Sequence, residues 1–228
     1  MVDFKIPCFD LAIDILLAIV AYLLGSISSA VWIGKKYYGI DVREHGSKNA
    51  GATNMLRVLG RRAALPVFVL DVLKGFVAVT LAHLAGYPPH SAPLFNMKVV
   101  MVVMVVLGHI FPVFAGFRGG KGVATLSGAV LGVAPNAVLL CLATFAIVLM
   151  ISHYVSLGSM VAGVMFPVYM VVVYRVTYLP LIIFGCIIAL LLIFTHRKNI
   201  RRLIKGTESK IFIWKTPRNR KRNLRGNQ

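Results

Sequence analysis

Apolar side chains form long runs along this chain, and most polar residues fall in the segments between them. A helix needs about 20 mostly apolar residues to cross a bilayer. Runs of that kind cover residues 10–34, 63–86, 94–114, 135–152, 156–175 and 178–195. A shorter run, 122–134, is counted as a seventh span because of the topology that it allows. The pattern predicts an all-α integral membrane protein, a bundle of about seven transmembrane helices.

The composition agrees with this interpretation. Of the 228 residues, 58% are hydrophobic and 14% are charged, whereas about a quarter of a soluble domain is charged. A disordered chain, a coiled coil and an ordinary soluble domain are therefore excluded. The first apolar run is too long for a cleaved signal and no A-x-A site follows it, so we expect a retained first span.

The net charge of +18 is concentrated in three segments, 35–62, 115–125 and 196–228, and the rest of the chain is balanced. Basic loops prefer the cytoplasmic side, which predicts an N-terminus outside and a cytoplasmic C-terminus. Six spans would place either the tail or the first basic loop on the wrong side. Residues 1–214 are expected to form a single domain. The basic tail 215–228 is expected to be disordered and to meet anionic lipid rather than nucleic acid.

The first basic segment contains an anion-binding pattern. Between Gly46 and Asn54 every residue except Lys48 is small or carries a short amide or hydroxyl, so backbone N–H groups can approach an anion closely. If a helix begins near Thr53, then Asn49, Thr53 and Arg57 share one face. The planar fork of Arg57 suits two phosphate oxygens.

The second segment contains the turn Gly119-Gly120-Lys121-Gly122. It fails the P-loop pattern twice, because position 115 is Ala and Lys121 is followed by Gly122. No strand precedes it, which excludes an NTPase. A glycine-rich turn with one lysine at a helix start remains an anion cradle.

Further candidates follow the later spans. Ser156 and Ser159 open one span, where helix capping and substrate contact are equally consistent with the sequence. His196 and Asn199 are three residues apart after the last long run. Asp71 and Lys74 lie within a span, where charges are costly and usually paired. No CxxC motif and no metal-ligand spacing occurs, so neither a metal nor a cofactor is expected.

Together these motifs resemble the bacterial acyl-phosphate:glycerol-3-phosphate acyltransferases. The matching stretches, in order and spacing over roughly residues 20–210, are GSKNAGATNMLRVLG, GHIFPVFAGFRGGKGVAT, YVSLGS and HRKNIRRLIKGTE. The resemblance implies a seven-helix membrane bundle, multi-pass in the cell inner membrane, with its active site facing the cytoplasm. It also implies transfer of a fatty acyl group from acyl phosphate to the sn-1 hydroxyl of glycerol 3-phosphate, the first acylation of phospholipid synthesis.

The resemblance also implies residue roles. Ser47, Arg57 and Lys121 would be catalytic. Substrate would be bound by Asn49, Gly51, Thr53, Asn54, Gly119, Gly120, Gly122, Ser156, Ser159, His196, Asn199 and Glu208, although Glu208 receives no specific role. The substrates would be acyl phosphate and glycerol 3-phosphate, beside membrane lipid and no nucleic acid. A contact with the enzyme that produces acyl phosphate is left open.

This chain departs from the family pattern at four positions. Ser28 replaces an expected Pro, Lys48 a Gly, Arg118 a Lys, and His153 an Arg. The last change removes a fixed charge near the expected site.

Two other functions use similar features. A thioester-dependent acyltransferase should contain H-x-x-x-x-D, and no histidine here has Asp five residues later. A polytopic anion or organophosphate transporter could use the same cradles, but it would more often show repeated halves. The sequence shows no such repeat.

Overall fold

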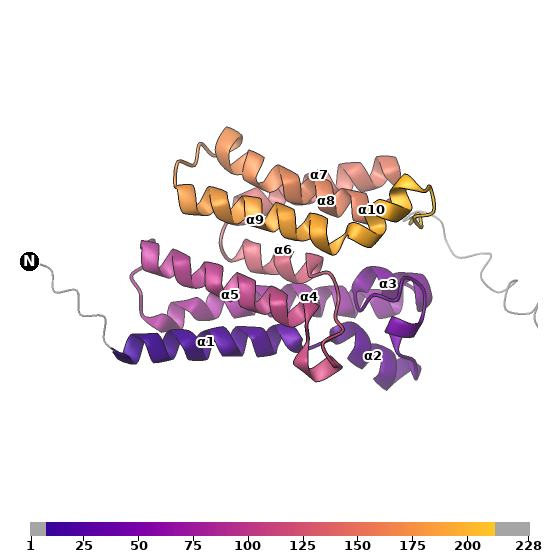
Figure 1. The fold of residues 1–228 in the computed structure, drawn as a ribbon, viewed down its shortest axis with the longest axis horizontal. Helices are drawn as coiled ribbons and strands as arrows, with labels where there is room; N and C mark the ends of the chain where they lie inside the picture. The colour runs from indigo at the N-terminus through magenta and orange to yellow at the C-terminus, as the bar shows by residue number, and fades with distance from the viewer. Residues whose placement is uncertain (1–7, 213–228) are drawn as a thin grey trace, which may run out of the picture.

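The structure is a computed structural model in which residues 8–212 are described (Figure 1). The predicted tail 215–228 lies outside the described residues. The described part of the chain contains helices and connecting loops, without strands. Its elements in order are α1 (Cys8–Ser26), α2 (Ser29–Tyr38), η1 (Val42–Glu44), α3 (Ala52–Val58), α4 (Arg61–Thr80), η2 (Leu81–Ala85), α5 (Ala92–Ile110), η3 (Val113–Ala115), α6 (Val123–Leu131), α7 (Pro135–Ser152), α8 (Val155–Val168), η4 (Tyr169–Val173), α9 (Leu179–Thr195) and α10 (Arg197–Ile204).

Each of the seven predicted apolar runs contains a helix. Five spans are long and apolar enough to cross a membrane, and a sixth results if α9 and α10, bent by 60°, count as one. The helix in the short run, α6, has nine residues, which at about 1.5 Å per residue is less than half of a bilayer core of about 30 Å. Helices long and apolar enough to cross a membrane are therefore confirmed, whereas seven full crossings remain a prediction.

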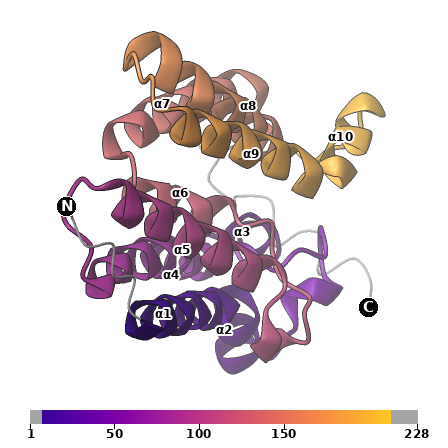
Figure 2. The same ribbon diagram turned by 60° about the vertical axis from the view of Figure 1, so that its left-hand side comes forward.

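The helices form two groups. Helices α1, α4, α5 and α6 lie in one group, and α7, α8 and α9 lie in a second group beside it (Figures 1 and 2). The turn after α6 connects the groups. One apolar core, with Met101, Val105 and Ala129 fully buried, extends through both.

Close helix contacts depend on glycine in the first group. A Cβ atom on Gly128 of α6 would collide with the carbonyl of Val72 on α4, and one on Gly75 would collide with the carbonyl of Thr125. The backbones of α4 and α6 can therefore touch, as small residues allow in membrane helices. The short α6 is held against α4 by this contact.

A second, smaller core supports the first basic loop. Val42 and Met55 are fully buried with Ala63 and Val67 of α4. Because Val42 precedes the glycine-rich stretch and Met55 follows it, this apolar contact fixes both ends of the loop against α4.

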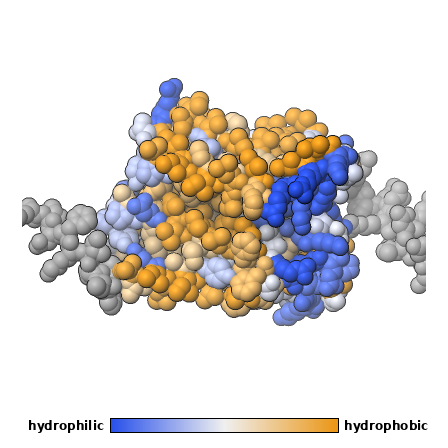
Figure 3. Space-filling model, viewed as in Figure 1, coloured by the Kyte–Doolittle hydropathy of each residue, from blue (hydrophilic) through white to orange (hydrophobic). Residues whose placement is uncertain are grey.

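Polar residues gather at one end of the molecule. Figure 3 shows hydrophobic side chains across its middle and a strongly hydrophilic surface at the end formed by α2, α3 and α10. The three basic segments that were expected on one side, 35–62, 115–125 and 196–228, all contribute residues to one cavity at this end.

Candidate functional site

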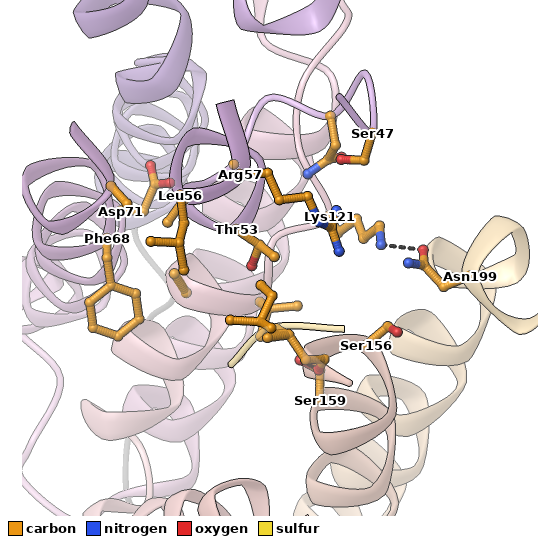
Figure 4. A pocket seen from close by; sticks show the side chains of 18 of the residues that line it. Ser47, Thr53, Leu56, Arg57, Phe68, Asp71, Lys121, Ser156, Ser159 and Asn199 are labelled. Carbon is orange, nitrogen blue, oxygen red and sulfur yellow. Dashed lines mark hydrogen bonds between the residues drawn. The ribbon is translucent and has the colours of Figure 1, made fainter. Parts of the chain in front are cut away.

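A cavity of about 470 Å³ opens between the two helix groups at the polar end (Figure 4). It brings together the loop before α3, the start of α6, the start of α8 and the region of α10. Twelve of the fifteen predicted site residues line it: Ser47, Asn49, Gly51, Thr53, Arg57, Lys121, Gly122, Ser156, Ser159, His196, Asn199 and Glu208. Four sequence motifs thus converge on one cavity.

The first loop presents its functional side chains through a local helix. As predicted, a helix begins beside Thr53, and Asn49, Thr53 and Arg57 all line the cavity. Figure 4 shows Ser47, Arg57 and Lys121 on one side of the cavity, opposite Ser156 and Ser159 of α8.

Asn54, predicted as a substrate contact, does not line the cavity. Its side chain is fully buried, and its Oδ1 accepts a hydrogen bond from the Ser47 backbone N–H at 2.8 Å. Its Nδ2 donates to the carbonyls of Val42 (2.8 Å) and His45 (3.0 Å). The amide is committed on both ends, so Asn54 shapes the loop from behind instead of facing the cavity.

The predicted cradle of Gly119 and Gly120 is also corrected. The Gly119 N–H donates to the Ile110 carbonyl at 3.1 Å, and the Gly120 N–H donates to the His109 carbonyl at 3.2 Å. Neither residue lines the cavity, and a Cβ on either would collide with the end of α5. These glycines allow the turn to pack on α5, and Lys121 and Gly122 alone reach the cavity.

Glu208, which received no specific role from the sequence, lies at the centre of the polar contacts. Its carboxylate accepts hydrogen bonds from Asn199 Nδ2 at 2.6 Å and Ser156 Oγ at 3.0 Å. Lys121 Nζ donates to Asn199 Oδ1, so a chain of contacts runs from Lys121 to Ser156. Glu208 is therefore the internal counter-ion of the site.

Cations surround this carboxylate. Arg57 Nη2 lies 3.9 Å from Oε1 and Arg202 Nε lies 3.8 Å from Oε2. Burial lowers the pKa of the Lys121 ammonium to about 8; Glu208 opposes the shift, while Arg202 and Arg57 add to it. With three cations near one buried acid, the site has excess positive charge and suits an anion.

A buried polar network adjoins the cavity. Lys74 Nζ lies 2.8 Å from Asp71 Oδ1, which confirms the predicted pair. Ser29 Oγ donates to the same oxygen at 3.1 Å. Asp71 and His109 line the cavity, and His109 Nδ1 lies 3.0 Å from Thr125 Oγ1. Nothing in the sequence spacing of Asp71 and His109 predicts that they meet.

An apolar pocket of about 140 Å³ continues from the cavity between the two helix groups. The two share five lining residues: Phe68, Val123, Ala124, Phe145 and Ser159. Deeper walls come from Val130, Phe166 and Ile188. The site therefore has a polar end rich in cations and an apolar end within the bundle.

Two further residues, His153 and Arg43, support the site through contacts that the sequence did not predict. His153, a departure from the family pattern, accepts a hydrogen bond at its carbonyl from Ile211 N–H at 2.8 Å. Its ring lies 4.7 Å from that of Phe212, so it tethers the segment that carries Glu208. Arg43 bonds to the turn before Lys121. Only the fold brings these residues to their partners.

Comparisons with known proteins agree with this geometry. Residues 15–206 match the sequence profile described as glycerol-3-phosphate acyltransferase. A protein of that name from Clostridioides difficile (strain 630) is 45% identical over 206 residues, covering 86% of this chain and 95% of the relative. One from Thermoanaerobacter sp. (strain X514) is 46% identical over 198 residues, with the same coverage of 86% and 95%.

Two solved structures also match. A crystal structure of PlsY (YgiH), an integral membrane glycerol 3-phosphate acyltransferase in its glycerol 3-phosphate form, has a TM-score of 0.77 and 37% identity. The match covers 87% of this chain and 96% of the PlsY chain. The lysophosphatidic acid form has a TM-score of 0.74 and 36% identity, covering 87% and 95%.

Proposed function

This chain belongs to the glycerol-3-phosphate acyltransferase family, as its motifs predicted, and we propose that it transfers a fatty acyl group from acyl phosphate to the sn-1 hydroxyl of glycerol 3-phosphate. The products are lysophosphatidic acid and inorganic phosphate. The observation that carries the proposal is the single cavity, in which excess cations at one end meet an apolar pocket at the other.

Both substrates are phosphate compounds, and the polar end can hold phosphate at two places. Arg57, with Ser47 and Thr53 beside it, would bind the acyl phosphate. Lys121, with Asn199 and His196 across the cavity, would bind the phosphate of glycerol 3-phosphate or further phosphate oxygens of the acyl phosphate. The acyl tail would enter the apolar pocket past Phe68 and Phe145. This arrangement accounts for the amphipathic shape of the site.

The chemistry needs little beyond orientation and charge. The hydroxyl oxygen attacks the acyl carbonyl carbon, a new ester C–O bond forms, and the bond to the phosphate oxygen breaks. An acyl phosphate is a mixed anhydride with a good leaving group. Placing the reactants together and neutralising the departing phosphate therefore supply most of what is needed.

We assign the proton of the attacking hydroxyl to an oxygen of the departing phosphate. The two acids that line the cavity are held beside cations: Glu208 accepts two hydrogen bonds at Oε1 and has Arg202 Nε 3.8 Å from Oε2, and Asp71 is paired with Lys74. Neighbouring positive charge makes a carboxylate a weaker base. The phosphate of the acyl phosphate, by contrast, is bonded to the carbonyl carbon that the hydroxyl attacks, so its oxygens lie beside the reacting hydroxyl. His109→Gln should thus keep more single-turnover activity than Lys121→Ala. Loss of the chemical step in His109→Gln, with both substrates still bound, would contradict this assignment.

Membership of the family does not identify the acyl donor, which an assay can test directly. Purified protein should acylate labelled glycerol 3-phosphate with acyl phosphate and not with acyl-CoA, because the site offers phosphate-binding groups and the chain lacks H-x-x-x-x-D. Comparable turnover with acyl-CoA, in a preparation free of other acyltransferases, would refute the donor assignment.

The charge distribution supports the location. Basic segments favour the cytoplasmic side, and the cavity lies at the end formed by those segments. We therefore place the active site on the cytoplasmic face of the bacterial inner membrane. A contact with the enzyme that makes acyl phosphate would then lie on this face.

A further inference from the structure

The ion pair between Asp41 and Arg43 joins the two loops of the site. Arg43 Nε and Nη2 donate to the two carboxylate oxygens of Asp41 at 2.9 and 2.7 Å. The Arg43 backbone N–H also donates to Asp41 Oδ1 at 3.0 Å. Both side chains are largely buried, with 14% and 11% of their surface exposed. The guanidinium is therefore held in one orientation by its own loop.

The remaining nitrogen of the fork reaches the second loop. Arg43 Nη1 donates to the carbonyl of Ala115 at 2.5 Å and to the carbonyl of Arg118 at 3.1 Å. These carbonyls belong to the turn that leads to Lys121. On its other side the turn is fixed to α5 by the backbone bonds of Gly119 and Gly120.

The first loop is equally well fixed. Asn54 binds the carbonyls of Val42 and His45, on either side of Arg43 and Glu44, and it also binds the N–H of Ser47. Arg43 thus belongs to the same rigid unit as Ser47 and the helix of Arg57. A displacement of Arg43 would be transmitted to the anion-binding side chains of this unit.

We propose that Arg43 is a positioning residue that sets the separation between the loop of Ser47 and Arg57 and the turn that carries Lys121. The inference rests on the proposed function, in which these two loops bind phosphate groups of the substrates. Arg43 lines no part of the cavity and acts through the groups that do.

The proposed role of Arg43 requires the planar, forked guanidinium and not only a positive charge. One guanidinium binds both oxygens of a carboxylate and two carbonyls at once, whereas a lysine ammonium is a point charge with a different geometry. The Arg43 guanidinium holds the pKa of the Asp41 carboxyl well below its usual range. The ion pair between Asp41 and Arg43 therefore stays ionised at all pH values at which the enzyme can be assayed.

The chain offers a matched control. Lys35 Nζ also contacts Asp41, at 3.4 Å from Oδ2, but its side chain is 59% exposed and belongs to α2. Removing Lys35 takes away a cation from the same carboxylate without cutting the connection between the loops.

The test compares Arg43→Ala, Arg43→Lys and Lys35→Ala in the full-length protein, with the unfolding temperature as a check of folding. One readout is kcat and KM with acyl phosphate and glycerol 3-phosphate. The other is the pH midpoint of acetylation of the Lys121 amine without substrate, measured by mass spectrometry. Burial chiefly sets the pKa of Lys121, with Glu208, Arg202 and Arg57 contributing, so a loosened turn should let water reach the amine and raise the midpoint.

We expect both Arg43 variants to lose roughly tenfold or more in kcat and to raise the Lys121 midpoint from about 8 toward 10.5. Lys35→Ala should change neither. Folded Arg43 variants with a wild-type midpoint would overturn the inference, as would full rescue by Arg43→Lys. If Arg43→Ala does not fold, Arg43→Lys decides. If the wild type makes no product, the proposed function fails, and the midpoint alone decides this inference.

Discussion

The charge of Lys121 depends strongly on its surroundings. Its ammonium is charged below a pKa of about 8, which burial lowers from the ordinary 10.5. The lysine binds an anion only when protonated, so raising the pH from 7 to 9 should reduce kcat/KM. Lys121→Arg keeps its charge and should move this loss to higher pH, whatever its activity at neutral pH. A pH–rate profile of both proteins measures this, and an unchanged alkaline limb in Lys121→Arg would assign the titration to another group.

Arg57 tests whether geometry or charge binds the phosphate. Arg57→Ala should lose most activity and Arg57→Lys should recover little, because a point charge cannot replace a planar fork. Loss of one charge-assisted contact costs about 1.5–3 kcal/mol, hence roughly tenfold or more in rate. Steady-state kinetics measure this, with Arg201→Lys on the exposed face of α10 as the control. Wild-type turnover in Arg57→Lys would show that Arg57 supplies only bulk charge.

Asn54 and Asn49 separate support of the loop from contact with substrate. Asn54→Ala removes the acceptor of the Ser47 N–H and one of the two donors to each of the carbonyls of Val42 and His45, and each hydrogen bond lost costs about 0.5–1.5 kcal/mol. Its unfolding temperature should therefore fall. Asn49→Ala, at a residue that lines the cavity, should leave that temperature unchanged and raise KM instead. Equal stability of the two variants would contradict this division.

The amino-acid pattern identified most of the residues that form the site, but it did not predict which way their side chains and N–H groups point. It identified Ser47, Arg57 and Lys121 because small residues next to a cation are typical of a loop that binds an anion. It assigned Asn54 and Gly120 to substrate because a motif does not reveal which way a side chain or N–H points. It gave no role to Glu208, whose partners Ser156 and Asn199 come from other elements.

At the scale of elements, the nine-residue α6 depends on backbone contact with α4. Gly128→Val should separate these helices, because even a Cβ there collides with the Val72 carbonyl. We expect a lower unfolding temperature and lower activity, since Lys121 directly precedes α6. Thermal unfolding in detergent measures this, and Ala146→Val on an exposed position of α7 is the control. Unfolding at the wild-type temperature in Gly128→Val would show that α6 does not need close packing.

Element boundaries were largely predictable. Apolar runs gave the starts of all six long helices within two residues, because hydrophobic length fixes a membrane helix. The runs 10–34 and 156–175 extend beyond the ends of α1 and α8. The break between α1 and α2, and the 60° bend between α9 and α10, were not predicted. At the first break the Ile27 carbonyl accepts a hydrogen bond from Lys74 of α4, and beyond the bend Asn199 binds Glu208. The apolar pattern does not record such polar contacts.

At the scale of the whole molecule, the central prediction is the orientation in the membrane. Cysteines placed at Asn49 and at Lys121 should be labelled from the cytoplasmic side, and a cysteine at Ser91 from the outside, in a variant without native cysteines. The net positive charge lies in the segments beside Asn49 and Lys121, which favours that side. Labelling of positions 49 and 91 from the same face would exclude this topology.

The assembly of the whole molecule was only partly predictable. The charge pattern placed three segments on one side, and the structure brings residues of all three to one cavity. The division into two helix groups, with an apolar pocket between them, could not be predicted, because nearly every face of these helices is apolar and the sequence does not show which faces meet.

The most direct measurement follows phosphate and acylated product together, with the purified protein in liposomes, acyl phosphate and labelled glycerol 3-phosphate. One phosphate should be released for each lysophosphatidic acid formed, and both products should be absent when either substrate is omitted. Labelled glycerol 3-phosphate that crosses the membrane without being acylated, and no ester product, would contradict the account and favour an anion transporter.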